Sequence, residues 1–334
     1  MSKKVKTLLI IITVLIVCYI TAAHFVIQIA LVPSFMEKLE VFETFTEKGY
    51  SEQVYTDDIL GEMEANKSET QEWFDEIEKY RYQLDSGDGY KLISAVFLRP
   101  EEENSHKWAL VLHGYTGWKE EMFPIACKFS REGYNVLVPD MLSQGESEGD
   151  YIGMGYTDRL DNVLWLKAIL KIDPDAEIVL YGQSMGASAV IHLCAELTEN
   201  EPDVRAHVAA AAADSAFCEP IKMFTSKVRD WTGLPCFGLV DTAAVLFKLE
   251  GGYSLYDAKA IDAVPKTDIP MLFIQGLEDK IVSPDNVYRL YDACTSPKSL
   301  LTVEGAGHCQ SYEKDPDLYF QSLFDFSDGY LTAK

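Results

Sequence analysis

The pentapeptide Gly182-Gln183-Ser184-Met185-Gly186 has the pattern G-x-S-x-G. It joins residues 177–181, which predict a strand, to residues 185–197, which predict a helix. A serine on so tight a turn has a strained backbone, and the two glycines let the strand and the helix approach without a Cβ clash. We expect Ser184 to be an exposed nucleophile at a helix N-terminus, which favours developing negative charge. An ordinary turn of small residues is the alternative.

A serine hydroxyl is a poor nucleophile at neutral pH and needs a neighbouring base. His308 follows the last expected strand, residues 299–303, in a glycine-rich loop. The other histidines are His24, His106, His113, His192 and His207. His24 lies in the N-terminal apolar stretch, and His106 precedes an expected strand. His207 lies within an expected strand, and His192 is two turns behind Ser184 on the expected helix. We therefore expect His308 to be the base, and His113, at a strand end, to frame the site.

The base is usually oriented by a carboxylate. Asp279 directly follows the expected strand 270–275, which precedes the strand that leads to His308. The order Ser184, Asp279, His308 is the serine, acid, histidine order of one known α/β architecture. Asp279 is therefore the expected acid, and Glu278 and Asp214 are the alternatives.

The turn His113-Gly114-Tyr115-Thr116-Gly117 ends another expected strand, residues 108–113. A glycine-bearing turn at this position points backbone N–H groups inward. We expect an oxyanion hole formed by the N–H groups of Tyr115 and Met185. Losing one such donor typically costs about 3 kcal/mol of transition-state stabilisation.

The elements that must position these residues begin near residue 89. Strands and helices then alternate, which predicts a largely parallel sheet covered by helices on both faces. The expected strands are residues 90–99, 108–113, 135–139, 177–181, 204–213, 270–275 and 299–303, and the expected helices are residues 120–132, 157–171, 185–197, 285–293 and 316–326. Residues 217–266 interrupt the alternation. They are too many and too apolar for a plain loop, and predict a lid.

The N-terminus differs from the rest of the chain. Lys3, Lys4 and Lys6 precede residues 7–32, which contain no Asp, Glu, Lys or Arg. About 20 such residues cross the hydrocarbon of a bilayer, so we expect residues 1–36 to be a membrane anchor. The basic flank places the N-terminus inside and the body outside the cell membrane, in a single pass. The alternative is a signal peptide cleaved after Thr21-Ala22-Ala23.

Residues 37–88 are acidic and predict a helical arm, either a spacer or a partner-binding helix pair. The chain of 334 residues has 29 basic and 53 acidic residues, for a net charge of -24. So negative a protein is repelled by phosphate backbones, which excludes nucleic-acid binding. Seven cysteines lack metal-binding spacing, and Cys218 with Cys236 is the one local disulfide candidate.

These residues resemble the α/β-hydrolase superfamily, and within it bacterial membrane-anchored serine hydrolases and esterases of the S33 type. Further likeness lies in Pro139-Asp140, residues 145–149 and 151–155, Asp161 and Trp165, so that it covers residues 89–330. Relatives commonly have Arg-Gly-His-Gly where this chain has Leu142-Ser143-Gln144-Gly145. The departure affects local hydrogen bonds under the oxyanion loop and no member of the triad.

The resemblance implies an α/β-hydrolase domain at residues 89–334, with a helical lid at about 217–266. It also implies acyl transfer through Ser184, with neither metal nor organic cofactor. The expected substrate is a small carboxylic ester with an apolar acyl or alcohol part. Two alternatives remain: an amidase or peptidase with the same triad, and a membrane-tethered binding module without catalysis. The sequence does not indicate an oligomeric state.

Overall fold

The apolar strands of the chain assemble into one twisted sheet. The computed structural model describes residues 1–38, 56–99, 106–232 and 238–332, with residues 230–232 described by their backbone alone. The eight strands lie in the order β1-β2-β4-β3-β5-β6-β7-β8. They are β1 (Glu78–Asp85), β2 (Lys91–Leu98), β3 (Lys107–Leu112), β4 (Asn135–Pro139), β5 (Glu177–Gln183), β6 (Val208–Asp214), β7 (Met271–Gly276) and β8 (Lys298–Val303). The pairs β1/β2 and β2/β4 are antiparallel, and the other pairs are parallel.

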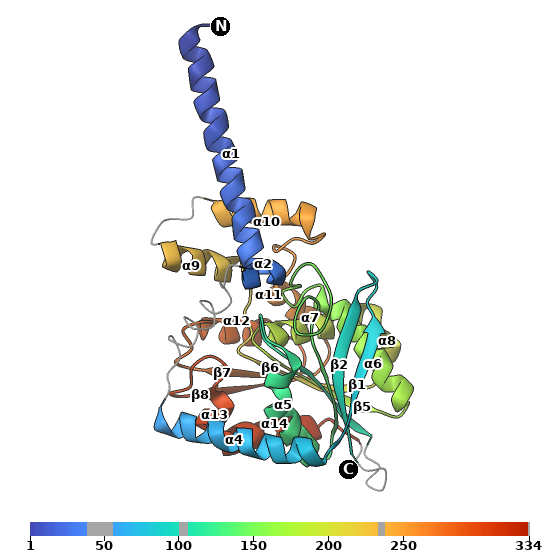
Figure 1. Ribbon diagram of the computed structural model, residues 1–334. Coiled ribbons are helices and arrows are strands. Elements are labelled where there is room, and N and C mark those ends of the chain that lie inside the picture. Colours follow the sequence, from blue (N-terminus) through green and yellow to red (C-terminus); the bar gives the residue numbers. More distant parts are fainter. Residues whose placement is uncertain (39–55, 100–105, 233–237, 333–334) are drawn as a thin grey trace.

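Helices cover both faces of the sheet, as the alternation of elements predicts (Figure 1). One face packs against α4 (Asp57–Glu76), α5 (Phe123–Arg131) and α14 (Pro316–Asp328). The other packs against α6 (Asp158–Ile172), α7 (Met185–Asn200) and α12 (Asp285–Ala293). Short elements complete the body: η2 (Lys119–Met122), α8 (Pro202–Arg205) and α13 (Ser311–Lys314). Alternate residues of each central strand face the two layers, so the parallel strands are buried on both sides.

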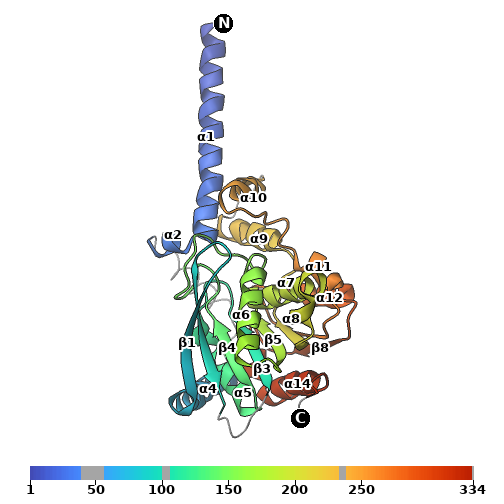
Figure 2. The ribbon, with the colours of Figure 1, turned by 90° about the vertical axis from the view of Figure 1, so that its right-hand side faces the viewer.

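The interruption at residues 217–266 is helical where the structure describes it. It contains α9 (Pro220–Thr232), α10 (Leu239–Glu250), α11 (Ala260–Ala263) and η3 (Val264–Lys266). Figures 1 and 2 show α9 and α10 on one end of the body, beside the lower part of the N-terminal helix. Cys236, the disulfide candidate, lies outside the described residues, and Cys218 is a free thiol near the Asn286 carbonyl.

The acidic segment 37–88 is not the separate helical arm that the sequence predicts. Residues 39–55 lie outside the described part, and α4 is a helix, but β1 is a strand that pairs along its whole length with β2. Trp73 of α4 is buried and packs on Phe97 of β2, with ring centroids 4.6 Å apart. Phe74 of α4 also packs on Phe97, with ring centroids 6.1 Å apart, so the aromatic rings of this helix cover the sheet. The folded body therefore includes α4 and β1, which precede residue 89.

Part of the N-terminal helix α1 (Lys3–Leu31) also packs against the body. By length and composition it passes for a membrane span, with a mean hydropathy of 2.6 in its most apolar window, a property that signal sequences share. Residues 3–22 are exposed, whereas Ala23, Ile27 and Leu31 are buried against the body. The short helix α2 (Pro33–Lys38) follows, with Met36 buried. The predicted boundary at residue 36 therefore falls inside α2. Both α2 and the last turns of α1 pack against the rest of the chain.

We expect replacement of Trp73 by alanine to lower the free energy of unfolding by about 3 kcal/mol, because it leaves a cavity between α4 and the sheet. Urea denaturation measures this. Leu60→Ala on the same helix is the matched control, since Leu60 is 49% exposed and its loss should cost less than about 0.5 kcal/mol. Equal stability of the two variants would mean that α4 is an independent arm.

Candidate active site

Ser184 occupies the strained turn between β5 and α7. Its φ of 54° and ψ of -113° lie outside the regions that non-glycine residues normally adopt. The backbone N–H of Ser184 donates to the Asp214 carbonyl on the neighbouring strand at 2.8 Å, which holds the turn. The side chain stays partly exposed at the carboxyl end of the parallel strands. The expected backbone strain and exposure of this serine are therefore confirmed.

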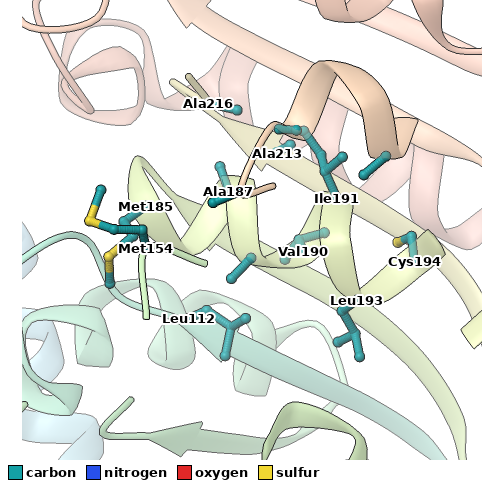
Figure 3. Close-up of a cluster of buried hydrophobic side chains, with 14 of the residues drawn as sticks. Leu112, Met154, Met185, Ala187, Val190, Ile191, Leu193, Cys194, Ala213 and Ala216 are labelled. Atoms are coloured by element: carbon teal, nitrogen blue, oxygen red, sulfur yellow. The ribbon is translucent and has the colours of Figure 1, made fainter. Parts of the chain in front are cut away.

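The two glycines of the pentapeptide are required by close backbone approach. A Cβ on Gly182 would lie 2.3 Å from the Gly186 carbonyl carbon, and a Cβ on Gly186 would lie 2.3 Å from the Leu112 carbonyl oxygen. Beyond them, Ala187 and Ala213 keep the contact between α7 and the sheet narrow (Figure 3). The small side chains thus let α7 start directly beneath Ser184.

His308 brings an imidazole to this serine from a loop after β8. Its Nε2 lies 2.8 Å from Ser184 Oγ, and its Nδ1 lies 2.7 Å from Asp279 Oδ2. The histidine side chain is 11% exposed and the Asp279 side chain is fully buried. The structure thus brings together the three side chains that the sequence analysis selected, in one continuous hydrogen-bonded chain.

Asp279 is held by a loop that follows β7. Its Oδ1 accepts hydrogen bonds of 2.8 Å from the backbone N–H groups of Ile281 and Val282. Its Oδ2 accepts from Gln275 Nε2 at 2.8 Å as well as from His308. Four donors therefore fix the carboxylate as an acceptor and leave His308 Nδ1 as the donor in their shared bond.

Opposing influences act on the pKa of His308. Burial lowers this pKa, whereas its neighbours Cys309 and Asp279 raise it, and the net direction is well upward from the ordinary value. Burial also raises the pKa of the Cys309 thiol, whereas the neighbouring His308 lowers it. The carboxyl group of Asp279 lies 2.7 Å from His308 Nδ1, where it would stabilise an imidazolium form of His308.

The turn after β3 lies next to the nucleophile. A Cβ on Gly114 would lie 3.6 Å from the Cβ of Ser184, so Tyr115 follows directly on a residue in contact with the serine. Met185 is the first residue of α7, and its N–H therefore has no acceptor within that helix. Met185 directly follows Ser184 and Tyr115 directly follows Gly114, and an oxyanion hole formed by their N–H groups remains a prediction.

His113 supports this turn and does not approach Ser184. The backbone N–H of Met141 donates to His113 Nε2 at 2.9 Å, so the proton is on Nδ1, which donates to the Gly114 carbonyl at 2.8 Å. Burial lowers the pKa of His113 and keeps the imidazole neutral. It therefore joins the Gly114 turn to the end of β4, in agreement with the framing position predicted for it.

The remaining candidates have other partners. His24 lies 3.0 Å from Glu250, His106 lies 2.9 Å from Asp173, and His207 lies 3.0 Å from the Ala176 carbonyl. Burial lowers the pKa of His192 to about 3. Of the alternative acids, Glu278 is exposed, and Asp214 is buried away from His308 Nδ1.

Sequence analysis missed the network that holds the His308 loop. Asp214 accepts hydrogen bonds of 2.9 Å from Ser215 Oγ and Tyr319 Oη. Ser215 Oγ in turn accepts from the backbone N–H of Cys309 at 3.3 Å. Burial raises the pKa of Asp214 to about 6. The position of Asp214 at a strand end marked it as a site residue, but Tyr319 lies too far along the chain for any local pattern to pair the two.

Residues 142–145, where the sequence differs from the pattern common in relatives, adjoin a turn whose hydrogen bonds are intact. Asp140 accepts from the backbone N–H and Nζ of Lys119 at 2.7 and 2.8 Å, and from the Glu146 N–H at 3.0 Å. The local change is instead at Gln144, where relatives commonly have histidine. Its side-chain amide is buried without a hydrogen-bond partner among the described residues. The departure thus alters hydrogen bonding next to the site and no contact of Ser184, Asp279 or His308.

With this geometry in view, comparison with known proteins identifies the family. A model described as the alpha/beta hydrolase family matches residues 109–321, more than half of the chain. The chain therefore belongs to the α/β hydrolase family.

Among curated proteins, the uncharacterized protein YqkD of Bacillus subtilis is 25% identical over 276 residues, which cover 82% of this chain and 87% of that protein. Among solved structures, the Pyrococcus furiosus esterase Pf2001 superposes with a TM-score of 0.61 at 21% identity, over 78% of this chain and 92% of that one. An acylaminoacyl peptidase of Pyrococcus horikoshii superposes with a TM-score of 0.57 at 16% identity, over 77% of this chain and 42% of that one. These two structures share the fold.

We expect Gly186→Ala to lower the free energy of unfolding by about 3 kcal/mol or more, because the added methyl would meet the backbone carbonyl of Leu112. Chemical denaturation measures the change. Gly61→Ala is the control, since a Cβ at this position of α4 has no neighbour within 4 Å and should stabilise the helix by about 1 kcal/mol. A harmless Gly186→Ala would show that α7 and β3 are not in the close contact described.

Proposed function

We propose that the protein is a serine hydrolase that cleaves a carboxylic ester through an acyl-enzyme intermediate. The observation that carries this proposal is the hydrogen-bonded chain from Ser184 Oγ through His308 to Asp279, at a strained turn beside the start of α7. A base that lies 2.8 Å from the nucleophile and 2.7 Å from the orienting acid is the arrangement that acyl transfer requires.

In the proposed reaction, Ser184 Oγ attacks the ester carbonyl carbon while His308 Nε2 takes the hydroxyl proton. The tetrahedral oxyanion accepts hydrogen bonds from the N–H groups of Tyr115 and Met185. His308 then gives the proton to the departing alkoxide, and the acyl group remains on Ser184. A water molecule, deprotonated by His308, then attacks this acyl-enzyme, and His308 returns the proton to Ser184 Oγ as the acid leaves. Asp279 stabilises the imidazolium in both halves.

The same triad supports amide or peptide cleavage, which differs in the amine that must be protonated as it leaves. The similarity to an esterase and to a peptidase concerns the fold alone. It does not distinguish cleavage of an ester bond from cleavage of an amide bond. The third alternative is that the protein is a membrane-tethered binding module without catalytic activity. Turnover of an aryl ester compared with an aminoacyl anilide separates the first two.

We also propose that α1 is a retained anchor that places the body outside the cell membrane in a single pass. The supporting observations are the lysines at its start, its apolar composition and the burial of its last turns in the body. Cleavage after Ala23, the signal-peptide alternative, would cut inside this continuous helix.

We expect a fluorophosphonate probe to label the full chain and to leave Ser184→Ala unlabelled, since only an activated serine hydroxyl attacks its phosphorus. Gel fluorescence or intact mass measures the labelling. Ser283→Ala, an exposed serine after β7 outside the hydrogen-bonded chain, should label like the wild type. Absence of labelling in the folded wild type would favour the binding module, and labelling of Ser184→Ala would remove this serine from the proposed role.

The pH dependence of ester turnover should report on His308, which must be neutral to accept a proton. Because its pKa is raised, kcat/KM should increase with pH through a midpoint above 6.5. Asp279→Asn removes the charge that raises this pKa, so the midpoint should move to lower pH while the plateau falls by about 10³- to 10⁴-fold.

The neighbouring exposed carboxyl provides the control for this pH profile, because Glu278→Gln changes charge without touching His308. Its profile should match that of the wild type. A midpoint that moved equally in both variants would show that Asp279 is not the partner of the base.

A further inference from the structure

The exposed part of α1 matches the thickness of a membrane. Residues 7–22 are exposed and carry no charge, and at about 1.5 Å per residue they measure about 24 Å, close to the roughly 30 Å of the hydrocarbon layer. Burial against the body begins at Ala23, directly after this stretch. No spacer separates the two, so a membrane-inserted α1 seats the body on the bilayer surface.

Helix α10 is the element at that surface. It lies across the lower part of α1 in Figures 1 and 2. Tyr19 Oη lies 3.3 Å from Thr242 Oγ1, and His24 Nδ1 lies 3.0 Å from Glu250 Oε1, so both ends of α10 contact α1. Tyr19 stands about 20 Å along the helix axis from Lys6, which is within the depth of a bilayer. A spanning α1 therefore carries α10 into the interfacial layer on the side of the body.

The outward side of α10 is suited to that layer. Val245 is 62% exposed and Leu249, one turn later, is 82% exposed. On the opposite side of the same helix, Ala244 and Phe247 are buried in the body. Asp241, Lys248 and Glu250 are exposed on the same helix, so its outward side carries both apolar and charged side chains. Such a mixed surface fits a position in the headgroup layer of a lipid bilayer.

The anchor also contacts the turn beside the nucleophile. Tyr115 Oη donates to the Ala30 carbonyl of α1 at 2.5 Å, and its ring packs on Phe224 of α9, with centroids 6.3 Å apart. The preceding residue, Gly114, lies against Ser184. Tyr115 therefore contacts both α1 and α9, and it belongs to the expected oxyanion turn. These contacts place the carboxyl ends of the strands, where Ser184 lies, at the membrane end of the body.

From these contacts we infer that α10 lies in the membrane interface with Val245 and Leu249 against lipid. We infer further that Ser184 receives its substrate directly from the bilayer. The substrate class is an ester with a long hydrocarbon chain that resides in the leaflet next to the body. The substrate part of this inference rests on the proposed function, and the placement of α10 does not.

Two esters with one leaving group test the substrate class, with the full chain in phosphatidylcholine vesicles. These are p-nitrophenyl butyrate, which is dissolved in water, and p-nitrophenyl palmitate, which resides in the bilayer. For the double variant Val245→Ser/Leu249→Ser we expect palmitate turnover to fall about tenfold and butyrate turnover to stay within about twofold. Unchanged palmitate turnover, or an equal loss with both esters, would overturn the inference.

The matched control is Leu60→Ser/Leu318→Ser, which alters two exposed leucines, 49% and 43% exposed, on α4 and α14 at the far end of the body. Neither ester should be affected. A loss of palmitate turnover equal to that of the α10 variant would overturn the assignment of the lipid contact to α10.

Placement of α10 is tested without any turnover, in a Ser184→Ala background. Brominated lipids should quench the tryptophan emission that Leu249→Trp adds and should leave that added by Leu60→Trp unquenched. Equal quenching of both, or of neither, would overturn the placement. If the wild type cleaves neither ester, the proposed function fails together with the substrate class, while the quenching still decides where α10 lies.

Discussion

The hydrogen bond between His308 Nε2 and Ser184 Oγ joins residues 124 positions apart at a distance of 2.8 Å. Parallel strands make this meeting feasible, because they deliver the loops that follow them to one edge of the sheet. β5 ends next to Ser184, β7 leads to Asp279 and β8 leads to His308. A shift in the position of any of these strands would separate the three side chains, so the register of the sheet is the constraint on which the site depends.

Close packing at the turn serves the same purpose. Gly182 and Gly186 allow backbone contacts that any other residue would block, and the buried Asp214 ties the loop of His308 to α14 through Tyr319. The strain at Ser184 is thus balanced by hydrogen bonds from neighbouring strands and loops. The resulting rigidity is what the proposed acyl transfer would need, since preorganised groups stabilise a transition state without rearranging.

Much of this arrangement is visible in the sequence because its signals are local. The G-x-S-x-G turn, the glycine loop of His308 and the strand before Asp279 each carry their pattern within a few residues. The sequence-based prediction failed where contacts between distant parts of the chain determine the local structure. Residues 78–85 were expected to be helical, but their backbone completes the sheet edge beside β2. Tyr319 and Asp214 lie 105 positions apart, and only the fold reveals that they are bonded.

The burial of Ala23, Ile27 and Leu31 in the body bears on how a water-soluble form of the protein should be made. Cutting the chain after the helix, at the boundary suggested by hydropathy, would remove the acceptor of Tyr115 and uncover the apolar surface on which α1 rests. A cut before Ala23, or polar residues on the exposed turns alone, keeps the docked segment. The last turns of α1 then still cover the apolar surface of the body, whatever the role of the preceding turns.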